Sequence, residues 1–182
     1  SYPQGPPWID VDVTQISTSA ARDDDSEGLL TFSPTGFTVT STQLANPPGA
    51  ITQFASHQTA GAEFALHLAA YGQTAADPVC GIIERYDGTK NMKFWSQYVD
   101  PSSGTVNATI DGAAAVAIEG SAVAQTVEFS QGKAAVAAKY KDVGRIRIFM
   151  KDDTTVNPEL PAGITGATAD FVVRPFAFTM GD

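Results

Sequence analysis

Two runs of acidic side chains have the chemistry that suits a hard cation. Asp23, Asp24 and Asp25 lie near the N-terminus, and Asp152 and Asp153 lie late in the chain. Calcium takes roughly six to eight oxygen ligands of this kind, and it can stiffen the junctions between extracellular modules. Neither run has the spacing of an EF-hand loop, so solvated loop charges are the alternative interpretation. We expect no cofactor other than this candidate calcium.

One aromatic cluster is a candidate ligand-binding site. It consists of Phe94, Trp95 and Tyr98. In an exposed loop these rings could stack on a sugar or anchor a protein partner. In a strand, Phe94 and Trp95 would face opposite sides, and at least one of them would belong to the core.

Nucleophiles and general bases show no catalytic arrangement. His57 and His67 are too few and too isolated for a metal site, and no serine stands in a nucleophile-elbow pattern. Cys80 is the only cysteine, which rules out an intrachain disulfide. We interpret it as a small buried residue, with a reactive or intermolecular thiol as the alternative. The protein is predicted not to be an enzyme.

The elements that must position these residues are β-strands. Apolar residues recur at every second position, the mark of half-buried strands, and the clearest runs are 64–68, 106–110, 127–129, 134–140, 146–150 and 171–173. Turn signals such as Asp111-Gly112 and Gln131-Gly132 separate the runs. Two alanine-rich segments, 58–70 and 112–124, carry glycines that argue against long helices, although one helical turn would fit.

Frequent short strands predict an all-β fold, an immunoglobulin-like β-sandwich with extra flanking strands at both termini. Asp142, Gly144, Ile146 and Ile148 have the spacing found where such a sandwich turns a corner into a core strand. Ile148 stands where antibody domains place a cysteine, which fits a sandwich held by packing without a disulfide.

The two ends of the chain resemble each other. Segment 12–16 matches 142–146, and segment 32–38 matches 173–179. Weak self-similarity at long spacing predicts tandem modules. The expected domains are an N-terminal strand segment at 1–30 (the tail of a preceding repeat or a donor-like arm), the sandwich at 31–175, and a C-terminal strand that starts the next repeat at 176–182.

Half-repeats at both termini would leave strand edges that need a partner. Unpaired edges pair with other chains by β-strand addition, and head-to-tail contacts propagate as an open fibre. The residues expected to take part in this strand exchange are Val11, Val13, Ile16, Phe176 and Phe178.

Composition narrows the classes of partner. The chain has 182 residues, a net charge of −9 and 17% charged residues, and one good core, or one core with a small satellite, is expected at this length. So acidic a chain lacks the basic surface that nucleic acid or an anionic membrane requires. No apolar stretch approaches the roughly 20 residues of a membrane helix. We therefore expect neither nucleic-acid binding nor membrane insertion.

Four segments resemble a known family. Segment 79–104 and the later segments 140–148, 151–153 and 171–178 are similar to repeats of the large MshQ-like proteins, which are associated with mannose-sensitive haemagglutinin and related type IV pili. The resemblance implies a pilus-associated or surface-exposed β-repeat protein of a Gram-negative bacterium, without catalytic residues to carry over. Those proteins are far longer than this chain.

These observations predict a non-enzymatic structural subunit of an extracellular bacterial filament or surface fibre. Its chains would assemble through β-strand complementation, with further copies or other pilus and surface proteins as partners. The alternatives are an adhesion or carbohydrate-binding module, and a spacer fragment of a longer pilus-associated repeat protein.

Overall fold

The computed structural model describes residues 8–10, 29–31, 36–72, 81–154 and 163–177. Contacts divide the chain into two compact units, Ser1–Ser33 and Pro34–Asp182. In the first unit, β1 (Trp8–Asp10) pairs antiparallel with β2 (Leu29–Thr31). The second unit is a β-sandwich.

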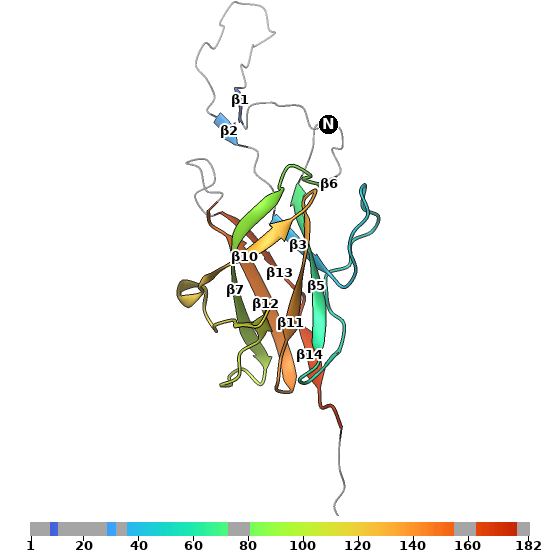
Figure 1. Cartoon of the computed structure of the whole chain (residues 1–182), viewed down its shortest axis with the longest axis vertical. Helices are drawn as coiled ribbons and strands as arrows, with labels where there is room; N and C mark the ends of the chain where they lie inside the picture. The colour runs from blue at the N-terminus through green and yellow to red at the C-terminus, as the bar shows by residue number, and fades with distance from the viewer. Residues whose placement is uncertain (1–7, 11–28, 32–35, 73–80, 155–162, 178–182) are drawn as a thin grey trace, which may run out of the picture. The chain divides into compact units, whose positions relative to one another are not determined.

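Twelve strands of the described residues form the sandwich (Figure 1). They are β3 Gly36–Thr40, β4 Gln58–Thr59, β5 Glu63–Gly72, β6 Gly81–Ile82, β7 Gly88–Asp100, β8 Thr109–Ile110, β9 Ala113–Ala114, β10 Ala124–Phe129, β11 Lys133–Lys139, β12 Gly144–Asp152, β13 Ile164–Ala167 and β14 Phe171–Arg174. A single 3-10 turn, η1 (Glu119–Ser121), is the only helical element in the same residues.

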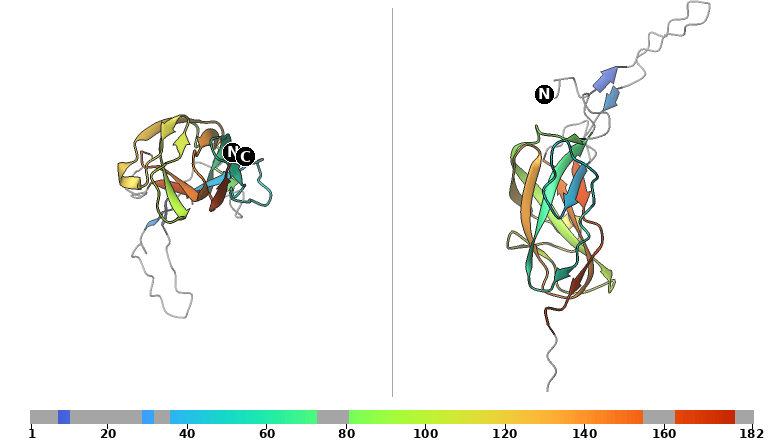
Figure 2. Two further views of the ribbon diagram at one scale, coloured as in Figure 1. Left: turned by 90° about the horizontal axis from the view of Figure 1, so that it is seen from below. Right: turned by 90° about the vertical axis from the view of Figure 1, so that its right-hand side faces the viewer.

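The strands follow one hydrogen-bonded path, β10-β7-β12-β13-β3-β5-β11-β8-β9, with β14 paired to β12 and β4, and β6 paired to β5. The pairs β13–β3 and β14–β4 are parallel, and the others are antiparallel. The path curls round on itself, so that strands near its two ends enclose a common core (Figure 2).

Alternate residues of the strands fill this core, as the period-two pattern predicts. On β11 and β12 the inward-facing residues are Ala134, Val136, Ala138, Ile146, Ile148 and Met150, all of them buried. The corner before β12 also has the predicted form. Gly144 has φ +134°, and a Cβ there would lie 2.8 Å from the carbonyl oxygen of Asp100, so only glycine fits.

The alanine-rich segments contain no long helix. Segment 58–70 supplies β4 and most of β5, whereas 112–124 supplies β9, η1 and the start of β10, which confirms the prediction. The run expected at 106–110 is shorter than predicted, because only Thr109–Ile110 pairs as a strand. The carbonyl oxygen of Val106 instead accepts a hydrogen bond from the Tyr98 hydroxyl.

Candidate interaction surface

The aromatic cluster is part of the fold. Phe94 points into the core with 1% of its surface exposed. Trp95 faces the other side of β7 and stacks on Phe149, with ring centroids 5.3 Å apart and planes 5° apart. The Tyr98 hydroxyl donates to the Val106 carbonyl. The three rings therefore do not form an exposed sugar-stacking surface, because Phe94 and Trp95 are buried and Tyr98 is half-buried.

Tyr140 lies beside this cluster. It is 2% exposed, and its carbonyl oxygen accepts a hydrogen bond of 2.8 Å from the Gly61 amide. Burial, and after it the neighbouring Tyr98 and Asp142, raises the pKa of the Tyr140 hydroxyl far above its usual range. This phenol stays protonated and acts as a structural group.

The second acidic run is also part of the fold. Asp152 is fully buried, its Oδ2 accepts a hydrogen bond of 2.5 Å from Tyr86, and its Oδ1 accepts two from Thr154. The Asp153 carboxylate forms an ion pair of 2.5 Å with Lys93. Both interpretations from the sequence, calcium and solvated loop charge, are thus corrected for Asp152, which ends β12 inside the core.

Other predicted groups lie outside the described residues. These are the acids Asp23, Asp24 and Asp25, the thiol Cys80, and the strand residues Val11, Val13, Ile16 and Phe178. Within the part of the chain that the structure describes, no three His, Cys, Asp or Glu side chains gather where they could hold a metal ion.

Tyr86 fixes the turn between β10 and β11. Its ring meets Phe129, the last residue of β10, edge to face at 4.7 Å. Its carbonyl oxygen accepts a hydrogen bond from Gly132 in the turn, and the neighbouring Asp87 side chain accepts one of 2.8 Å from Gln131. The end of β10 is therefore held firmly in place.

The rest of β10 forms an open edge. It pairs with β7 from Ala124 opposite Lys93 to Phe129 opposite Gly88, without a register shift. It ends the strand path, and among the described residues no second strand pairs with it.

The direction of the peptide groups on β10 follows from the turn. Ser130 exchanges hydrogen bonds with Lys133, so its N–H and C=O point away from β7. Peptide direction alternates along an antiparallel strand. The N–H and C=O groups of Ala124, Thr126 and Glu128 therefore point to the free side as well, and all three residues are exposed.

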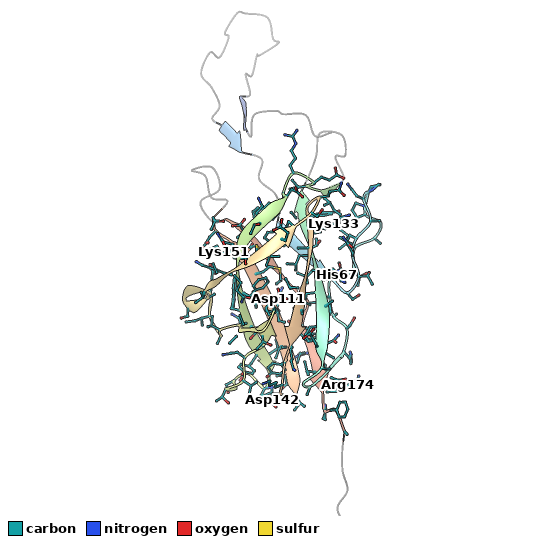
Figure 3. The ribbon with its side chains drawn as sticks, viewed as in Figure 1. His67, Asp111, Lys133, Asp142, Lys151 and Arg174 are labelled. Carbon is teal, nitrogen blue, oxygen red and sulfur yellow. The ribbon has the colours of Figure 1, made fainter. Side chains whose placement is uncertain are left out.

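The strands at the other end of the path are short, and the turn between them covers part of the neighbouring β11 edge. β8 and β9 have two residues each. The Asp111 amide donates to the Ala137 carbonyl at 2.7 Å, and the Asp111 carboxylate accepts from the Ala137 amide at 2.8 Å. Asp111 thus occupies the β11 edge where β8 ends (Figure 3).

A few large apolar side chains are exposed in the described residues. The large hydrophobic residues found exposed in the described part of the chain are Ile118 (61%), Val123 (79%), Val143 (44%) and Phe176 (84%). Val123 directly precedes β10, Ile118 precedes η1, and Phe176 follows β14. The sequence pattern had singled out Phe176 but not the edge of β10, because a strand's neighbours cannot be read from its own residues.

The architecture defines the class of protein as an immunoglobulin-like β-sandwich with additional strands, which confirms the predicted fold class. Residues 15–165 match the family described as "Domain of unknown function (DUF6701), first Ig-like domain", and the chain belongs to this family. The match has no specific tie to MshQ-like proteins.

No curated protein matches the chain. Among solved structures, the ASH / PapD-like domain of human CEP192 (PapD-like domain 7) is similar over 91% of this chain and 99% of that domain, with 12% identity and a TM-score of 0.31. We draw no argument from a likeness at this TM-score. The described residues include no helix of the length and apolar character that a membrane span requires.

Proposed function

We propose that this protein is a non-enzymatic structural module of an extracellular bacterial filament or surface fibre, joined to its neighbours by β-strand pairing between chains. Its partners would be further copies or other surface proteins. The support comes from the two places where the chain enters and leaves the sandwich.

The chain crosses the sandwich from one end to the other. Gly36, at the start of β3, pairs with Tyr71 near the C-terminal end of β5. Arg174, at the end of β14, accepts a hydrogen bond from the Ala60 amide just before β5 begins. β5 has 10 residues, which corresponds to about 30 Å of strand. Modules of this geometry can follow one another in line, as a fibre requires (Figure 1).

The same geometry supports a second candidate, a spacer module in a longer repeat protein. A spacer would be joined to its neighbours by the chain itself and would not need strand pairing with other copies. The carbohydrate-binding alternative receives no such support, because Phe94 and Trp95 are buried and the half-buried Tyr98 uses its hydroxyl within the fold.

A concentration series of the purified full chain tests the proposal. We expect oligomers to grow with concentration in analytical ultracentrifugation, filaments in negative-stain micrographs, and weaker association when residues 1–16 are removed. If the chain stays monomeric across a wide concentration range and the truncation changes nothing, the fibre proposal fails and the spacer remains.

A further inference from the structure

We propose that the open edge of β10 is the acceptor for the C-terminal segment 175–180 of a second copy of this chain, which adds to it as a further strand. This inference rests on the proposed function, because it names one pair of surfaces through which the chains would join.

The acceptor edge lacks the usual protection against strand addition. Natural sheets block their edges with short strands, lysine, proline or bulges. β10 is six residues long, contains neither lysine nor proline, and keeps regular register with β7. Its one charged side chain, Glu128, accepts a hydrogen bond of 2.6 Å from Thr89 on β7. The peptide groups of Ala124, Thr126 and Glu128 all point to its free side. An added strand would satisfy these groups with main-chain hydrogen bonds.

Apolar surface lies beside this edge. Val123, the residue immediately before β10, is 79% exposed. An added strand with apolar side chains would cover part of this exposed apolar surface.

The C-terminal segment has the matching pattern. Phe176, Phe178 and Met180 alternate with Ala177 and Thr179, and no charged residue stands within 175–180. Phe176 is 84% exposed directly after the end of a core strand. Pro175 would take the first position of the added strand, where proline is tolerated. The segment also has the six-residue length of β10.

The occupant must come from another copy, because the segment leaves its own sandwich in the wrong direction. β14 runs antiparallel to β12 and ends near Gly144, at the level of Asp100 on β7. β10 pairs with the other half of β7, from Gly88 to Lys93. The seven residues between these levels span about 23 Å, and six residues reach only about 20 Å even if the chain reversed at once. Pairing between copies would be head-to-tail, which builds an open fibre.

A disulfide trap tests the pairing in full-length protein with Cys80→Ser as background. Thr126→Cys protein is mixed with Ala177→Cys protein under mild oxidation, because both positions would lie on the outer face of the joined strands. We expect a crosslinked heterodimer, identified by mass spectrometry. Ala114→Cys on the short strand β9 is the matched control, since it is also exposed, and we expect little crosslinking from it. Equal crosslinking from positions 114 and 126, or none from 126 while oligomers form, would overturn the assignment.

A second test needs no crosslinking and compares two variants of the β10 edge. Thr126→Pro deletes an outward-pointing N–H and leaves the ladder with β7 in place, whereas Thr126→Val keeps that N–H. We expect Thr126→Pro to weaken association at least tenfold and Thr126→Val to associate like the wild type, with circular dichroism confirming that both fold. If the wild type associates and Thr126→Pro does so equally, only the β10 assignment fails. If the wild type itself stays monomeric, the proposed function fails with it.

Discussion

The two ends of the strand path differ in how much exposed strand edge they present. β8 and β9 are reduced to two residues each, and the Asp111 side chain accepts the hydrogen bond that a neighbouring strand would otherwise take. β10 keeps six residues and leaves its outer side open. At one end the terminal strands are short and a side chain occupies the β11 edge beside them, whereas the other end is fixed at its turn and left free along its length.

The two turns beside these edges sharpen the contrast. Asp111-Gly112 and Gln131-Gly132 are both two-residue turns with positive φ at each residue, 47° and 82° in the first and 51° and 75° in the second. A Cβ on Gly132 would lie 2.4 Å from the Ile83 carbonyl oxygen, but one on Gly112 would meet nothing within 4 Å. Of the two glycines, only Gly132, next to β10, is packed against the rest of the fold.

The largest expected effect comes from exchanging these glycines for alanine. Gly112→Ala should destabilise the protein by about 1 kcal/mol, because only the left-handed backbone is strained. Gly132→Ala adds a backbone clash and should cost about 3 kcal/mol. Urea unfolding followed by circular dichroism measures both. Equal losses would mean that the β10 turn is no more firmly held than the other.

Removing the Tyr86 hydroxyl should have the next largest effect. Tyr86→Phe keeps the ring contact with Phe129 but takes a donor from the buried Asp152 carboxylate. We expect a loss of about 2 kcal/mol, with faster amide exchange at Gln131 and Gly132. Tyr98→Phe, at a half-buried position, is the control and should leave exchange in that turn unchanged. Unchanged stability in Tyr86→Phe would show that the turn does not depend on this hydrogen bond.

The smallest effect is expected at the blocked edge. Asp111→Ala leaves the Ala137 amide without its side-chain acceptor and should cost about 1 kcal/mol in urea unfolding. Asp111→Asn keeps an acceptor and tolerates the left-handed backbone, so it should stay within about 0.5 kcal/mol of the wild type. Increased self-association of Asp111→Ala in ultracentrifugation would support the protective role of this side chain. A destabilisation by the asparagine variant equal to that by alanine would argue against it.

Much of the fold could be predicted from local pattern. The alternation within 134–140 and 146–150 predicts strands, and these became β11 and β12 with the expected inward faces. The burial of Asp152 could also have been predicted from the alternation. This residue continues the even-numbered register of Ile148 and Met150, so its inward direction follows from the same alternation that placed them in the core.

The candidate site was harder to predict because it depends on pairing between distant segments. Nothing in the residues of β10 states that it ends the path, since its neighbour β7 lies more than 20 residues earlier in the chain. Trp95 points away from the core side of β7, and its burial comes from Phe149 on another strand. Local periodicity shows direction within a strand, but neighbours and covering groups are properties of the topology.

The passage of the chain from one end of the sandwich to the other also determines how the module would respond to tension. A pull applied at Gly36 and Arg174 would act nearly parallel to the strands, and the β3–β5 ladder would carry it across five residue pairs, from Gly36 opposite Tyr71 to Thr40 opposite His67. Hydrogen bonds sheared in this direction must break together instead of opening one at a time. Because forced unfolding is governed by the unfolding rate, such a module would keep its length under a steady drag.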